Sequence, residues 1–121
     1  MKTKRILCLD FDGICCTRPK KREGYDILPD LPTEGLFEFL LEAYKVFDIV
    51  VYSTVKSRCP SSRTAMIQWF VRYGYTCACS YTESEICWYA PGSVEPLVAL
   101  SFPAEEPTWC VMLLGEKFHC S

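Results

Sequence analysis

Several features that common functional classes require are scarce in this sequence. Its 121 residues include one histidine, His119, and no apolar run approaches the length of a membrane span. The formal net charge is only -2, so the chain lacks the positive field that attracts nucleic acid. We therefore expect no membrane association and no nucleic-acid partner.

Cysteine is abundant, with nine residues, but its arrangement fits neither secretion nor a zinc site. The N-terminus begins with charge, yet its apolar stretch is short and is interrupted by two aspartates, unlike a signal peptide. Cys15 and Cys16 are adjacent, and one residue separates Cys77 from Cys79, whereas structural zinc sites use paired two-residue gaps. We therefore expect a cytoplasmic protein whose reduced cysteines mostly pack in the core.

The length fits a single domain over residues 1–121, and 50% of the residues are hydrophobic, as is usual for a folded globular protein. Two stretches inside it lack periodicity. Residues 14–33 are rich in Pro, Lys and Arg and predict a long loop or small flap. Residues 81–107 contain four prolines and predict an irregular segment with one short strand near Leu97 to Leu100.

Outside these stretches, strand patterns alternate with helix patterns. Continuous apolar or β-branched runs predict strands over residues 5–9, 49–52, 75–80 and 109–114. Apolar residues at helical spacing predict helices within residues 32–48 and 61–74. This alternation predicts an α/β fold, a three-layer α/β/α sandwich with a central parallel sheet.

Polar residues follow the first two predicted strands where those strands end. Asp10 and Asp12 come after the first strand, and Ser53 and Thr54 come after the second. Because ligands of such sheets bind beyond the carboxyl ends of the strands, we expect these residues to converge at one edge. Gly13 would let the backbone turn tightly beside a bound phosphate.

The chemistry of this group of residues indicates phosphate handling. Two carboxylates placed two residues apart repel each other unless a cation or a shared proton relieves them, and Mg²⁺ prefers such oxygen ligands. One carboxylate can attack phosphorus and form an aspartyl-phosphate, while the other protonates the leaving oxygen and later activates water. The hydroxyl groups of Ser53 and Thr54, with nearby backbone N–H groups, can hold phosphate oxygens.

Two motifs resemble those of a known family. RILCLDFDGI, residues 5–14, resembles the first motif of the haloacid dehalogenase-like (HAD) phosphohydrolases, an apolar strand followed by Asp, any residue, Asp and Gly. IVVYST, residues 49–54, resembles their second motif, an apolar strand ending in Ser or Thr. Residues 27–54 also resemble the small, nearly capless bacterial and phage members. The resemblance covers Arg5 to about Tyr75.

The resemblance implies a Rossmannoid fold with little or no cap and assigns roles to individual residues. Asp10 would be the nucleophile and Asp12 the general acid/base. Ser53 would bind the transferring phosphoryl group. Mg²⁺ would be held by the side chain of Asp10 and the backbone carbonyl of Asp12.

The C-terminal part of the chain departs from the family pattern. The small members tend to carry Glu-Lys-Pro before the last strand, whereas residues 105–107 here read Glu-Glu-Pro. They also end that strand with an acidic pair that completes the Mg²⁺ shell, whereas no aspartate follows Asp48 in this chain. Glu116 is the candidate substitute metal ligand, and Lys117 is the candidate substitute cation.

Two functions stay open. The first is Mg²⁺-dependent phosphomonoester hydrolysis through an aspartyl-phosphate on Asp10, acting on a small phosphorylated substrate, or on a larger one if the site is open. The second is a catalytically inactive HAD-like domain, a pseudoenzyme that binds a ligand or a protein partner. Loss of one preorganised charge contact typically costs about 10²–10³ in rate. The two alternatives therefore differ in whether the chain compensates for the missing lysine and acidic pair. The sequence does not indicate an oligomeric state.

Overall fold

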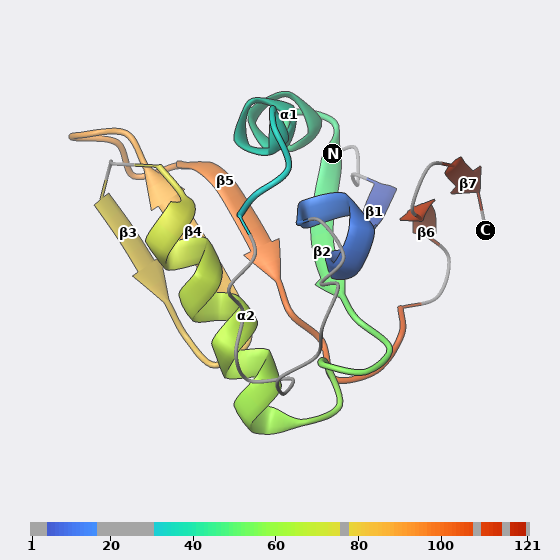
Figure 1. Cartoon of the computed structure of the whole chain (residues 1–121). Helices are drawn as coiled ribbons and strands as arrows, with labels where there is room; N and C mark the ends of the chain where they lie inside the picture. The colour runs from blue at the N-terminus through green and yellow to red at the C-terminus, as the bar shows by residue number, and fades with distance from the viewer. Residues whose placement is uncertain (1–4, 17–30, 76–77, 108–109, 115–116, 121) are drawn as a thin grey trace.

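One mixed sheet of seven strands organises the molecule (Figure 1). The computed structural model describes residues 5–16, 31–75, 78–107, 110–114 and 117–120. The strands are β1 Arg5–Asp10, β2 Phe47–Tyr52, β3 Ala78–Tyr81, β4 Glu85–Tyr89, β5 Pro96–Ser101, β6 Cys110–Leu114 and β7 Lys117–Cys120. Their order across the sheet is β3-β4-β5-β2-β1-β6-β7.

The centre of the sheet is parallel and its flanks are antiparallel. β1 pairs in parallel with β2 and with β6, and β2 pairs in parallel with β5. β3, β4 and β5 form an antiparallel meander on one side, and β6 and β7 form an antiparallel pair on the other. The carboxyl ends of four parallel strands therefore share one edge, and those of β2 and β5 point towards the bottom of Figure 1.

Two α-helices and one tight turn pack against the sheet. They are α1 Leu36–Ala43, α2 Pro60–Tyr73 and the turn η1 Phe11–Cys15, which follows β1 directly and is kinked at Asp12 and Gly13. Pro60 opens α2, a position where its missing N–H costs nothing. Gly74 ends α2, and a Cβ at that position would lie 2.5 Å from the Trp88 ring, so the close approach of helix and strand requires glycine.

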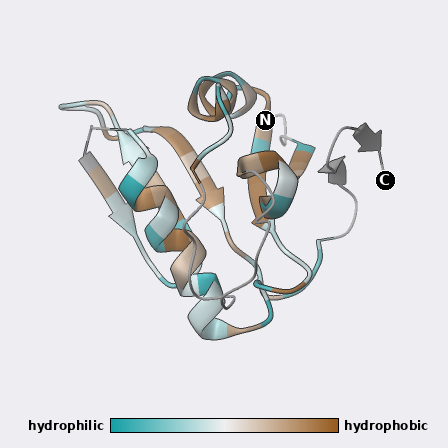
Figure 2. Ribbon diagram, in the orientation of Figure 1, coloured by the Kyte–Doolittle hydropathy of each residue, from teal (hydrophilic) through white to brown (hydrophobic). Residues whose placement is uncertain are grey.

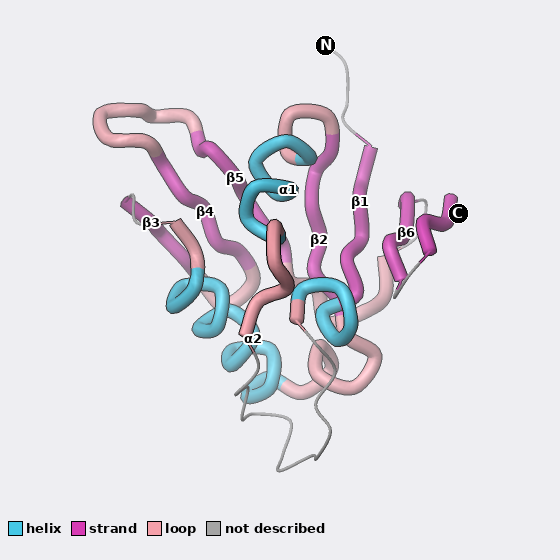
Figure 3. The backbone as a smooth tube through the Cα atoms, turned by 45° about the horizontal axis from the view of Figure 1, so that its top comes forward, coloured by secondary structure: helices cyan, strands magenta, loops and turns pink. Residues whose placement is uncertain are grey.

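The main core lies between these helices and one face of the sheet (Figure 3). Alternate residues of the central strands point to it, as the strand period of two requires: Leu7, Leu9, Ile49, Val51, Val98 and Leu100. The central strands carry apolar residues, shown in brown in Figure 2. The opposite face holds a smaller cluster in which Cys8 and Tyr52 are buried. In the described part of the chain, both α-helices thus cover the same face.

The predicted three-layer sandwich with a central parallel sheet is therefore wrong. The described helices form one layer rather than two, and the sheet is mixed. The cause lies after α2, where β3, β4 and β5 are joined by short turns instead of crossover helices. Antiparallel neighbours need only such short connections, whereas parallel neighbours need a crossover of a dozen or more residues.

Individual elements differ from the predictions to varying extents. The strands predicted over residues 5–9 and 49–52 are confirmed as β1 and β2, and the strand near Leu97 to Leu100 is confirmed as β5. The third predicted strand forms as β3 but pairs antiparallel. Residues 81–107, predicted to be irregular apart from one strand, also contain β4, and β7 was not predicted. Most of the predicted loop over residues 14–33 lies outside the described residues.

The helices of the described residues are too short or too polar to cross a lipid bilayer.

Candidate functional site

The site residues predicted from the two motifs come together through strand register. Asp10, the last residue of β1, is the parallel partner of Tyr52, the last residue of β2. Both strands therefore end at the same level of the sheet, and the residues that follow them leave at the same edge. This register brings Asp12 and Ser53 into contact.

The first contact joins two side chains that are 41 residues apart. The Ser53 hydroxyl donates a hydrogen bond of 3.3 Å to Oδ2 of Asp12. The same hydroxyl oxygen accepts a 3.1 Å bond from the backbone N–H of Lys56. Ser53 is buried, so its hydroxyl acts as a fixed link between the η1 turn and the loop after β2.

A cation completes the group. Nζ of Lys56 lies 2.8 Å from Oδ1 and 2.9 Å from Oδ2 of Asp12. Lys56 is only 6% exposed, and its ammonium group sits 5.7 Å from the centroid of the Phe11 ring. Charged hydrogen bonds of this kind are stronger than neutral ones, and partial burial weakens their screening by solvent.

The sequence pattern does not point to Lys56, because the family pattern places its cation at residues 105–107 and the candidate substitute is Lys117. The signal available was a lysine three residues after Ser53, in the loop that follows a strand ending at the ligand-binding edge.

The loop between β2 and α2 is held in shape by its own hydrogen bonds. The backbone N–H of Ser53 donates to Oγ of Ser57 at 2.9 Å, and the N–H of Ser57 donates back to the Ser53 carbonyl at 3.0 Å. Arg63 of α2 donates to the Ser57 carbonyl at 2.6 Å. Ser57 is fully buried. These bonds fix the direction from which Lys56 approaches Asp12.

The remaining predicted residues occupy different positions around this group. Asp10 is partly exposed at the end of β1. Gly13 has φ of +96°, in the left-handed region that glycine tolerates best, and its N–H donates to the Cys16 carbonyl at 2.8 Å. Thr54 is exposed, and no hydrogen bond joins its side chain to the Asp12 group in the described residues. Glu116 lies outside the described residues.

Buried cysteines border the η1 turn. Cys15 and Cys16 are both buried, which agrees with their predicted packing role. Burial, followed by the neighbouring Cys16 and then the charges of Asp10 and Asp12, raises the pKa of Cys15 well above its usual value. Cys15 therefore stays a neutral thiol near neutral pH and does not supply a nucleophile.

The oxygen donors of this site fit Mg²⁺ only if water and substrate phosphate supply the remaining ligands. In the described ranges, no three His, Cys, Asp or Glu side chains are grouped so as to hold a metal ion. The Asp12 carboxylate contacts Lys56 and Ser53, so the donors to consider are the two that the family resemblance implies, the Asp10 carboxylate and the Asp12 backbone carbonyl. Mg²⁺ commonly binds through one or two protein oxygens, several waters and substrate phosphate. The donor set fits that mode.

An open cavity of about 520 Å³ lies at the same sheet edge. Its described lining residues are Arg58, from the loop after β2, and Ala104 and Glu105, from the segment after β5. These two segments both lie at the bottom of the sheet in Figure 1. The volume is in the range of pockets that hold small molecules.

No family model, characterised protein or solved structure matches the chain.

Proposed function

We propose that the chain is a phosphomonoester hydrolase that acts through an aspartyl-phosphate on Asp10. One observation carries this proposal: Ser53 and Lys56 both contact the carboxylate of Asp12, two residues beyond Asp10, at the carboxyl edge of the parallel strands. A carboxylate nucleophile, a second carboxylate, a hydroxyl and a cation are the groups that phosphoryl transfer through an aspartate uses.

The residues act in two steps in this proposal. A carboxylate oxygen of Asp10 attacks phosphorus and the ester P–O bond breaks, while Asp12 gives a proton to the leaving alcohol oxygen. Asp12 then takes a proton from a water molecule, which attacks the aspartyl-phosphate, frees Asp10 and releases inorganic phosphate. Ser53 keeps the Asp12 carboxyl group oriented in both steps.

Lys56 supplies a positive charge, which residues 105–107, Glu-Glu-Pro, do not carry. A phosphoryl group brings negative charge to a site that already holds Asp10 and Asp12, and a nearby ammonium group offsets this repulsion. Bound Mg²⁺, held by Asp10 and the Asp12 carbonyl, would neutralise phosphate charge further. The hydrogen-bonded loop around Ser57 supports this role because it holds Lys56 beside the Asp12 carboxylate.

The proposal includes a small phosphorylated substrate and a cytoplasmic location. The open cavity beside Arg58 and Glu105 provides room for the part of the substrate that carries the phosphate. Cys15, Cys59 and Cys87 form no disulfide, as is usual in a reducing compartment.

The test is release of phosphate from a generic aryl phosphate in the presence of Mg²⁺. Activity should be present in the native chain and absent from Asp10→Asn. Asp48→Asn is the matched control, because Asp48 is an exposed aspartate near the opposite end of β2. Equal background in all three proteins, with no dependence on Mg²⁺, would exclude the hydrolase.

A specific observation also favours the second function, a phosphate-binding domain without turnover. Lys56 contacts both carboxylate oxygens of Asp12. This ion pair therefore engages the carboxylate that would have to give and take protons in catalysis. In that case calorimetric titration with inorganic phosphate would show binding that Lys56→Ala weakens, while the aryl phosphate assay gives only background.

A further inference from the structure

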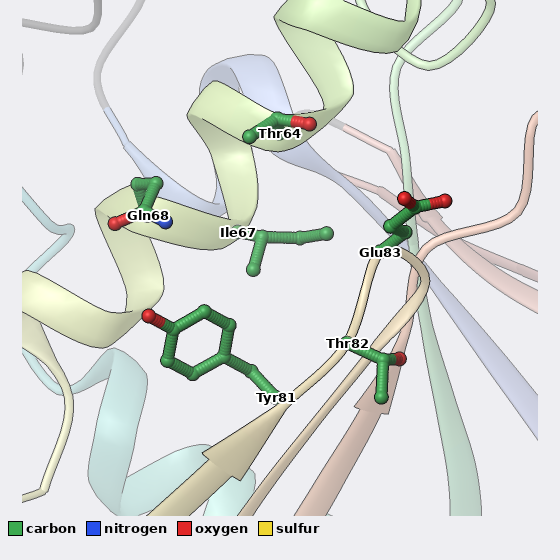
Figure 4. A pocket seen from close by; sticks show the side chains of 6 residues that line it. All are labelled: Thr64, Ile67, Gln68, Tyr81, Thr82 and Glu83. Carbon is green, nitrogen blue, oxygen red and sulfur yellow. The ribbon is translucent and has the colours of Figure 1, made fainter.

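A groove lies between α2 and the turn that joins β3 to β4 (Figure 4). Its volume is about 230 Å³, which is below the range of about 300–1,000 Å³ usual for drug-sized ligands, so it suits a small molecule. It shares no described lining residue with the cavity beside Arg58 and Glu105. Its described lining comes from the middle of α2, the end of β3 and the turn that follows: Thr64, Ile67, Gln68, Tyr81, Thr82 and Glu83.

One part of the groove is apolar. Ile67 is 2% exposed and belongs to the main core, so packing fixes its position. Tyr81 is the register partner of Ile86, which is buried against the helices, so the Tyr81 ring lies on the helix-covered face. Half of the Tyr81 surface is accessible, and Figure 4 shows the ring directed towards α2. An apolar or aromatic group placed on Ile67 would therefore also contact this ring.

Polar groups gather at the other end of the groove. In Figure 4 the Thr64 hydroxyl and the Glu83 carboxylate lie on the opposite side of Ile67 from the Tyr81 ring. Glu83 is exposed, and within the described residues no hydrogen bond or ion pair engages its carboxylate. It is also the only charged residue of the described lining. The groove thus combines an apolar floor with a single anionic end.

The basic residues of α2 do not neutralise this end. Arg63 donates to the carbonyl of Ser57, in the loop on the other side of the helix start. Arg72 is exposed about two helical turns beyond Thr64 and is not part of the described lining. The anionic end therefore favours a cationic ligand over an anionic one.

The turn that carries Glu83 is held by hydrogen bonds on both of its sides. The N–H of Thr82 donates to the Glu85 carbonyl at 2.8 Å, and the N–H of Ser84 donates to Oγ1 of Thr82 at 3.4 Å. The N–H of Phe102, just after β5, donates to the Ser84 carbonyl at 2.8 Å. A groove that is formed in advance loses less conformational entropy when a ligand binds.

We propose that this groove binds a small primary amine with an apolar or aromatic body. An ammonium group has three N–H donors and no acceptor, so the Glu83 carboxylate and the Thr64 hydroxyl oxygen can both accept hydrogen bonds from it. The body of the ligand lies on Ile67 and against the Tyr81 ring. Glu83 repels a carboxylic acid of the same shape, and a neutral molecule does not pair with its charge. The site does not depend on the proposed function.

Titration of 2-phenylethylamine into the full chain, followed by ¹⁵N–¹H NMR, tests this site. Gln68 is the only glutamine and the chain has no asparagine, so its side-chain amide signal is unique and reports directly on the groove. That signal should shift and reach saturation as the amine is added. The matched anion 3-phenylpropionate and the neutral 2-phenylethanol should each bind at least about fivefold more weakly.

Substitutions in the groove assign the contacts. Glu83→Gln should raise the dissociation constant of the amine about fivefold, since it removes the charge at an exposed position. Tyr81→Ala should raise it about tenfold because the ring is lost, whereas Tyr81→Phe keeps the ring and should leave the constant unchanged. Glu95→Gln is the matched control for charge, because Glu95 is an exposed acid outside the described lining, and it should also have no effect.

Circular dichroism of each variant confirms that the fold is kept, as expected for exposed positions. A Gln68 signal that the amine leaves in place overturns the proposal, and this is also the outcome if the groove instead receives a side chain of another protein. Equal affinity for the amine and for 3-phenylpropionate, or an affinity that Glu83→Gln and Tyr81→Ala leave unchanged, overturns it equally.

Discussion

Nζ of Lys56 lies 2.8 Å and 2.9 Å from the two carboxylate oxygens of Asp12, although 44 residues separate them in the chain. The lysine comes from the loop after β2, and the aspartate comes from the turn after β1. Their nearly symmetric contact links two adjacent parallel strands just beyond their carboxyl ends. The cation that contacts Asp12 thus comes from the same loop that begins with Ser53.

Replacing Lys56 should reduce both stability and activity. Lys56→Ala leaves the partly buried Asp12 carboxylate without its ion-pair partner, and we expect a loss of about 1–3 kcal/mol in the free energy of unfolding. Hydrolysis of an aryl phosphate should fall by about 10²–10³. Urea denaturation and steady-state kinetics measure the two effects. The control is Lys45→Ala, which removes an exposed ion pair with Glu42 and should cost less than about 1 kcal/mol. Equal effects of the two substitutions would contradict this account.

Ser53 and Thr54 are adjacent hydroxyl residues that should respond differently to substitution. Ser53→Ala removes the donor to Asp12 and leaves the Lys56 N–H without its acceptor, at a cost of about 1–3 kcal/mol. Thr54→Ala changes an exposed side chain and should stay within about 0.5 kcal/mol of the native chain. Thermal unfolding of both variants decides the matter. A larger loss for Thr54→Ala would show that the hydroxyl contact of Ser53 does not hold the loop.

Cys59 should be the most readily alkylated cysteine near neutral pH among those in the described residues. It is exposed at the N-cap of α2, and the hydrogen bond with the Ser61 side chain, followed by contacts with Ser62, lowers its pKa to about 7. Burial, and then the charge of Glu85, raises the pKa of Cys87. The thiolate is the reactive form, so a lowered pKa moves the midpoint of the rate profile to lower pH.

Mass spectrometry of iodoacetamide labelling against pH should give a midpoint near pH 7 for Cys59 and a higher one for Cys87. Ser61→Ala should move the Cys59 midpoint upwards, because it removes the side-chain hydrogen bond of 3.2 Å. A Cys59 midpoint at or above the ordinary value of 9.0, or one that Ser61→Ala leaves in place, would contradict the assigned cause.

The central strands were predictable because continuous apolar runs in the sequence indicate strands that are buried in the sheet. RILCL and IVVY are short apolar runs, and the structure buries both as the inner strands of the sheet. Strands that lie in the parallel centre of a sheet end at a common edge, so the approach of Asp12 and Ser53 followed from the two runs alone.

The flanks of the sheet were not predictable in the same way. The pattern predicted β3 as a strand, but its direction depends on whether the chain returns by a turn or a crossover. Apolar periodicity does not distinguish the two. Residues 81–107 have weak periodicity, and β4 acquires its place only by pairing between β3 and β5. For this reason the prediction of a second layer of helices is wrong.

Local pattern thus decided which segments become buried strands and which polar residues leave them at the shared edge, since burial and strand period are properties of neighbouring residues. Tertiary structure alone decided the direction of the flanking strands, the single described layer of helices and the partner of Asp12. Lys56 reaches that carboxylate because hydrogen bonds within its own loop and to α2 aim its side chain, and such bonds exist only once β1, β2 and α2 have packed together.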